Sequence, residues 1–209
     1  MMAMGADLGQ RRSKSRSCAK KMLVLVEGAS ERKYFEYFRG RSSDLKIIPV
    51  EVKRSGLEQI IEECRYRIKE YRIEGVEDKA AAVFDVDCFT EEDIKSSIDK
   101  VPEHDVSLYV SNPSFEYWLI LHFRDFNKYT TQKDMEDELS LLLGQKYAKS
   151  EGISGVITDE KINEAILRAS KIISPDRAGP IICKKILPST TVHLLVHEIL
   201  SIADSKCLR

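Results

Sequence analysis

Four short apolar runs divide the first half of the chain, at residues 22–26, 45–52, 80–84 and 106–110. A continuous apolar run of this length is typical of a strand that is buried on both faces of a parallel sheet. The segments between the runs carry apolar residues at helical spacing, most clearly over residues 57–73. This alternation predicts an α/β fold, in which a mostly parallel, four-stranded, Rossmann-like sheet spans about residues 20–111.

Helix signals occur between the strands and through the rest of the chain. Ser30 and Thr90 are well placed to cap helices inside the sheet region, and Pro113 after Asn112 takes a favourable first helical position. Further helices are predicted over residues 133–143 and 159–173 and from about residue 192. We therefore expect three parts: a basic, disordered leader (1–20), an α/β core (21–111) and a helical C-terminal part packed on the core (112–209).

Composition narrows the class of protein. A chain of 209 residues suits one ordinary domain or a domain with an extension, and its 32% of charged residues fit a folded, soluble protein. The formal net charge of −1 gives no overall basic signal for nucleic acid. The leader alone is basic, and it is either a nucleic-acid contact or, more commonly, a solvated tail. Its positive residues are Arg11, Arg12, Lys14, Arg16, Lys20 and Lys21.

Neither a membrane anchor nor a disulfide framework is expected. No stretch approaches the roughly 20 apolar residues that cross a bilayer. The five cysteines are scattered without a CxxC spacing, which favours reduced thiols in a cytoplasmic protein. His193 and His197 lie four residues apart, but without an HExxH spacing a zinc site is not favoured. His122 is expected to be a packed core residue, and His104 to lie on a loop.

Acidic residues follow two of the predicted strands. Asp85 and Asp87 end the third strand, and Glu27 ends the first. Ligands of open α/β sheets bind outside the carboxyl ends of the strands, so these carboxylates are candidates for one site. Their oxygens suit Mg²⁺ or Mn²⁺, which serve phosphate chemistry. The alternative stays open that Asp85 caps a turn, Asp87 is solvated and Glu27 pairs with a nearby cation.

Four segments carry a resemblance to a known family. LVLVEGASE (23–31) and VFDVD (83–87) resemble the two signatures of a TOPRIM domain, the metal-binding fold of primases, type II topoisomerases and OLD-type nucleases. SNPSFEYWLILHF (111–123) closely resembles a signature of the RloB family, and PSTTVH (188–193) resembles a later block of that family. The resemblance covers about residues 20–203.

The resemblance implies a TOPRIM-like prokaryotic protein, often encoded beside an ATPase in restriction or abortive-infection loci. It implies that Glu27 is a metal ligand or general acid/base and that Asp85 and Asp87 bind metal. Glu31 matches a second acidic position of the OLD-like nucleases, where a second metal can bind. Glu116 is a further possible ligand, although an acid in a first helical turn is also favoured by the helix dipole alone.

Two functions follow as hypotheses. The first is a Mg²⁺-dependent nuclease that acts on RNA or DNA in anti-phage defence, with Glu27, Asp85 and Asp87 as catalytic residues. The second is a non-catalytic component that binds nucleic acid or a companion ATPase. Nucleotidyl transfer is a third possibility, but no nucleotide site is evident. Lys184 and Lys185 could stabilise phosphate charge, although a solvated pair is the commoner case.

Overall fold

One mixed sheet organises the molecule. The computed structural model describes residues 19–53, 57–86, 92, 106–128, 130–173 and 188–204. The sheet has the strand order β2-β1-β3-β4-β5, in which the first four strands are parallel and β5 runs antiparallel to β4. The strands are β1 (Lys20–Val26), β2 (Leu45–Glu51), β3 (Lys79–Asp85), β4 (Val106–Asn112) and β5 (Ser189–Thr190). The predicted α/β class with a mostly parallel sheet is confirmed, and β5 is an addition to the four predicted strands.

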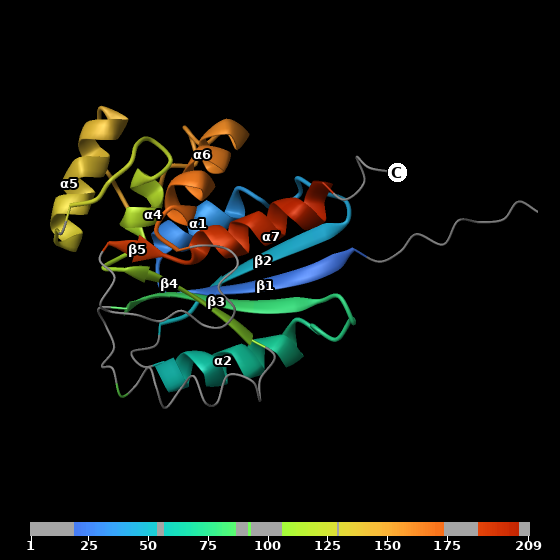
Figure 1. Ribbon diagram of the computed structural model, residues 1–209. Helices are drawn as coiled ribbons and strands as arrows, with labels where there is room; N and C mark the ends of the chain where they lie inside the picture. The colour runs from blue at the N-terminus through green and yellow to red at the C-terminus, as the bar shows by residue number, and fades with distance from the viewer. Residues whose placement is uncertain are drawn as a thin grey trace, which may run out of the picture.

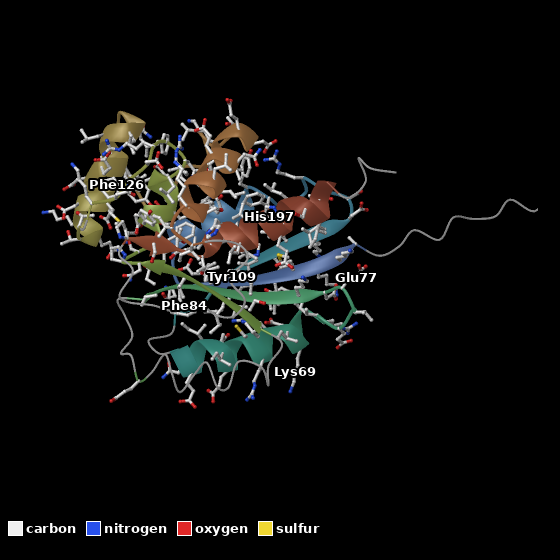
Figure 2. All side chains as sticks on the ribbon, viewed as in Figure 1. Lys69, Glu77, Phe84, Tyr109, Phe126 and His197 are labelled. Atoms are coloured by element: carbon white, nitrogen blue, oxygen red, sulfur yellow. The ribbon has the colours of Figure 1, made fainter. Side chains whose placement is uncertain are left out.

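Helices cover both faces of this sheet (Figure 1). On one side lies α2 (Leu57–Glu70), and on the other lie α1 and the helices of the second half of the chain. Lys69 on α2 and His197 on the last helix mark these two outer layers in Figure 2. The remaining helices are α1 (Ala29–Glu36), α4 (Glu116–Ile120), α5 (Gln132–Leu143), α6 (Asp159–Ser170) and α7 (Val192–Asp204).

The strand sequences explain why the sheet is covered on both faces. In β1 the alternate residues Met22 and Val24 pack into the cluster beneath α1, α4 and α7, whereas Leu23 and Leu25 pack into the cluster beneath α2. All four side chains are 1% exposed or less. A strand that is apolar at every position therefore needs two helical layers, and burial of each such side chain is worth roughly 1.5–3 kcal/mol.

Two predicted helix starts were wrong. The helix α1 has Gly28, not Ser30, at its N-cap, and no side chain caps it. Asn112 does not cap a helix that begins at Pro113, because Asn112 is the last residue of β4 and is held there by pairing with Ser189. The helix α4 begins only at Glu116. Ser30 and Asn112 both favour caps in isolation, but each has a tertiary partner that outweighs this preference.

Several predicted features lie outside the described residues or shift slightly. The basic leader before residue 19 and the helix expected from Thr90 lie outside them. Lys20 and Lys21 belong to β1, where Lys20 pairs with Glu77. Among the helices that the structure describes, none combines the length and the apolar character that crossing a bilayer requires.

Candidate functional site

The carboxyl ends of β1 and β3 bring the first two predicted site residues together. Val26 pairs with Val83 in the parallel register, so Glu27 and Asp85 follow at the same edge of the sheet. Oε2 of Glu27 accepts a hydrogen bond of 3.0 Å from the backbone amide of Asp85. Asp85 continues the alternation of Ala81 and Val83, whose side chains face the cluster beneath α1 and α4. The two carboxylates therefore mark the edge of the sheet on the side of these helices.

The turn from β1 into α1 adds a third carboxylate. Gly28 separates Glu27 from the helix, and Glu31 lies in the first helical turn with only 5% of its surface exposed. A Cβ atom on Gly28 would approach Oε2 of Glu31 to 2.8 Å, a distance that real Cβ atoms essentially never show. The glycine of the EG turn therefore gives the Glu31 carboxylate the space to fold back toward Glu27.

Glu116 in α4 supplies the fourth carboxylate. It is 2% exposed and comes from the segment directly after β4. Three groups approach its Oε1 atom: the hydroxyl of Ser30 at 3.4 Å, the hydroxyl of Tyr147 at 3.3 Å and Nζ of Lys149 at 3.6 Å. A buried carboxylate is tolerated when donors satisfy it, and here they converge on one oxygen. These donors, and not the helix dipole alone, therefore stabilise the Glu116 carboxylate in its buried position.

Electrostatics link Glu31 to the other carboxylates. Burial above all, and then the negative charges of Glu116 and Glu27, raise the pKa of the Glu31 carboxyl to about 7. A hydrogen bond from its own backbone amide and the charge of Lys149 oppose this increase only in part. Carboxylates that are buried side by side repel one another, which makes the cluster a favourable place for an added cation.

Three contributors to the site were missed by sequence reasoning. Ser30 was interpreted only as a helix cap, and Tyr147 and Lys149 lie in the loop between α5 and α6, far along the chain from Glu27. Tyr147 also contacts the Ser30 hydroxyl, with 2.7 Å between the two oxygens. No spacing or motif marks this loop, because its place in the site depends on how α5 packs on α4.

The other predicted residues lie outside the described ranges, at the edge of the sheet, or in the packed core. Asp87, His104, Lys184 and Lys185 lie outside the described residues. Asn112 is 5% exposed in β4, at the same edge of the sheet as Asp85. His122 is a packed core residue as predicted: its Nδ1 donates to the Trp118 carbonyl at 3.0 Å, and its Nε2 lies 3.1 Å from the Tyr34 hydroxyl.

His193 is unsuited to bind zinc. Its Nδ1 and Nε2 atoms each lie 3.0 Å from a backbone carbonyl, of Thr190 and Ile173 respectively, and its ring is fully buried. His197, four residues later, is exposed on α7. Both ring nitrogens of His193 are thus engaged with the backbone, which agrees with the expectation that this pair is not a zinc site.

The described carboxylates fit a hard divalent cation by type. Their donor atoms are oxygens, which Mg²⁺ and Mn²⁺ prefer, and Gly28 leaves room for one of them. Glu27 is linked to Asp85 through the Asp85 backbone amide, and the charges of Glu116 and Glu27 both act on Glu31. Within the described ranges, no three His, Cys, Asp or Glu side chains form a group that could hold a metal ion. Asp87 is the remaining predicted ligand of this edge, and it lies outside those ranges.

Comparisons with known proteins identify the family. The family model described as RloB-like protein matches residues 22–199, which include most of β1, all the carboxylates of the site, the loop between α5 and α6 and most of α7. No curated protein and no solved structure matches this sequence. Because the family model spans well over half of the sequence, the chain belongs to the family of RloB-like proteins.

Proposed function

We propose that this RloB-like protein is a metal-dependent nuclease that hydrolyses phosphodiester bonds in RNA or DNA. One observation carries the proposal. Glu27 and Asp85 follow two neighbouring parallel strands, and the buried Glu31 lies close enough to Glu116 and Glu27 for their charges to act on it, at the edge of the sheet where α/β proteins bind ligands. Burying this much negative charge is costly, and a function that uses a bound cation explains why it is kept.

The residues divide into two proposed roles. Glu27, Asp85 and Asp87 hold one Mg²⁺ or Mn²⁺ ion, and Glu31 with Glu116 holds a second. Such an ion polarises a phosphoryl oxygen and lowers the pKa of bound water. Glu27 also has a structural role, because its Oε2 atom accepts a hydrogen bond from the backbone amide of Asp85 at the end of β3.

The reaction is hydrolysis at phosphorus. A water oxygen forms a new bond to phosphorus, and the bond from phosphorus to one sugar oxygen breaks. One proton of the water passes to a carboxylate of the cluster, and the departing oxygen takes a proton from solvent. The protein residues orient the water and the phosphate, which supplies proximity and preorganisation.

Substitution of the acids tests this function in the full chain. Labelled single- and double-stranded RNA and DNA are incubated with Mg²⁺, with Mn²⁺ or with EDTA. We expect cleavage that requires the metal and falls at least about a hundredfold in Glu27→Gln and Asp85→Asn, since even the groups that support a ligand are worth 10–100-fold. Glu62→Gln, at an exposed position of α2, is the matched control and keeps full activity.

Two results would contradict the proposal. Cleavage that persists unchanged in both acid variants places the activity elsewhere, in a contaminant or another site. The absence of cleavage with every substrate, together with full phage protection by the Asp85→Asn variant in cells, supports the non-catalytic binding role instead. The anti-phage setting and a companion ATPase belong to the same proposal, supported by the family resemblance, and co-purification of an ATPase with the tagged chain tests that partner.

A further inference from the structure

The loop between α5 and α6 places the positive charge of Lys149 beside Glu116. Nζ of Lys149 lies 3.6 Å from Oε1 of Glu116 and 3.1 Å from Oε1 of Glu136. The Lys149 side chain is 45% exposed, whereas the Glu116 side chain is 2% exposed. The ammonium group therefore contacts a buried carboxylate while it remains partly accessible to solvent.

This position is fixed by the residues before Lys149. The Tyr147 ring is 7% exposed, and its hydroxyl contacts Ser30 at 2.7 Å and Glu116 at 3.3 Å. The Tyr147 backbone amide donates to the Ser140 hydroxyl at 3.0 Å, which ties the loop to the end of α5. Lys149 follows two residues later, so α1, α4 and α5 together determine where its side chain starts. A cation on such an anchored loop is preorganised.

The charge of Lys149 also acts on the sheet edge. Partial burial lowers the pKa of its ammonium group, but the neighbouring carboxylates, with Glu116 the strongest, raise the pKa above its ordinary value. Asp85 is among the charges that contribute, so the influence of Lys149 extends from Glu116 to the end of β3. The ion pairs of Lys149 with Glu116 and Glu136 therefore place its positive charge next to the buried acid.

A phosphodiester approaching this site is an anion that meets several carboxylates. Metal ions would offset part of the repulsion, and a partly exposed positive side chain beside these carboxylates can supply a direct contact to a phosphate oxygen. We propose that Lys149 is a substrate-binding residue that donates to a phosphate oxygen of the nucleic acid at this site. The inference rests on the proposed nuclease function and adds the residue that recognises the backbone of the substrate.

The salt dependence of binding separates this role from a purely structural one. Lys149→Gln, Lys149→Arg and the control Lys146→Gln, an exposed lysine of the same loop, are compared with the wild type. The probes are fluorescent single strands of DNA and RNA, titrated at several salt concentrations with Ca²⁺ in place of Mg²⁺. One phosphate contact contributes roughly 0.7 to the slope of log K against log salt for single strands.

We expect Lys149→Gln to weaken binding about five- to twentyfold at low salt and to reduce this slope by about 0.7, as for the loss of one phosphate contact. Lys149→Arg keeps the wild-type slope, and Lys146→Gln changes neither quantity. If Lys149→Gln lowers thermal stability or Mn²⁺ affinity while the slope stays the same, Lys149 only neutralises Glu116 and the inference is wrong. The inference is equally wrong if neither strand binds the wild type.

The same variants separate failure of this inference from failure of the nuclease proposal. If Glu27→Gln abolishes cleavage but Lys149→Gln binds and cleaves like the wild type, only the role of Lys149 is refuted. If Glu27→Gln cleaves normally, the proposed nuclease site is refuted, whatever the behaviour of Lys149.

Discussion

Replacement of Glu31 by glutamine tests the electrostatics of the acidic cluster without any knowledge of the substrate. Glutamine has nearly the same shape but no charge. In the unfolded chain the Glu31 carboxyl has its ordinary pKa of 4.5, whereas burial and the neighbouring carboxylates hold its pKa in the folded protein at about 7. Between these values the folded state binds more protons than the unfolded state. A rise in pH therefore favours unfolding, and the glutamine variant escapes this penalty.

The size of the effect follows from the two pKa values. Their difference of about 2.5 units corresponds to roughly 3 kcal/mol once both states are ionised, at about 1.4 kcal/mol per unit. At pH 8 the wild type bears nearly all of this cost. At pH 5 it bears only about 1 kcal/mol, because the folded carboxyl is still protonated. In the absence of metal, Glu31→Gln should therefore gain about 2 kcal/mol over the wild type between pH 5 and pH 8.

Urea unfolding followed by circular dichroism at pH 5 and pH 8, in EDTA, measures this difference. Glu62→Gln on α2 is the control for the loss of one exposed negative charge. Mn²⁺ should then stabilise the wild type at pH 8, because a ligand that binds only the folded state adds to its stability, and should stabilise Glu31→Gln less. The reasoning is refuted if Glu31→Gln shows no pH-dependent gain over the wild type, or if Glu62→Gln shows the same gain.

Substitutions at three positions, Gly28, Glu27 and His122, test separate parts of the site and of the core next to it. Gly28→Ala places a methyl group 2.8 Å from Oε2 of Glu31, so the Mn²⁺ affinity measured by calorimetry should fall about tenfold. Gly155→Ala is the control, because its added methyl group meets nothing within 4 Å, and it should leave the Mn²⁺ affinity unchanged. Glu27→Gln keeps an oxygen for the Asp85 amide whereas Glu27→Ala does not, so the alanine variant should be less stable by about 1 kcal/mol in urea, and equal stabilities would contradict the hydrogen bond. Burial lowers the pKa of His122 from 6.5 to about 4, so this residue should cost the folded protein about 2 kcal/mol as pH falls from 7.5 to 5, opposite in sign to the effect of Glu31. His122→Phe should therefore gain about 2 kcal/mol relative to the wild type over this range while cleavage persists, and an unchanged difference between the two proteins would contradict this assignment.

The sequence predicts the sheet well because its strands are buried on both faces. The four predicted apolar runs correspond to β1 to β4, and the segments between them suit the parallel arrangement. The fifth strand has two residues, Ser189 and Thr190, which are too few to show an alternation. The ends of helices were less predictable, since the contacts of Ser30 with Glu116 and Tyr147 and the pairing of Asn112 with Ser189 involve residues that are distant in sequence.

In the candidate site too, the predictable residues are those whose position follows from the local sequence. Glu27 and Asp85 could be predicted, because residues that follow neighbouring parallel strands must lie at one edge of the sheet. Glu31 was predicted from the resemblance to OLD-like nucleases, and Glu116 as an acid of a first helical turn after the fourth strand. Lys149 was not found, since only the packing of the loop after α5 brings its side chain to Glu116. Local sequence patterns therefore predict where the acidic residues lie, whereas only tertiary packing brings the positively charged Lys149 to Glu116.

The order of the site residues along the chain also bears on protein synthesis. A ribosome that has just translated Ser111 has made Glu27 and Asp85, but not Glu116, Lys149 or the strand β5 that pairs with the end of β4. Chains that end there thus lack Glu116, Tyr147 and Lys149. Under the proposed nuclease function, a chain that stops at this point lacks one proposed metal ligand, Glu116, and the proposed substrate-binding residue, Lys149.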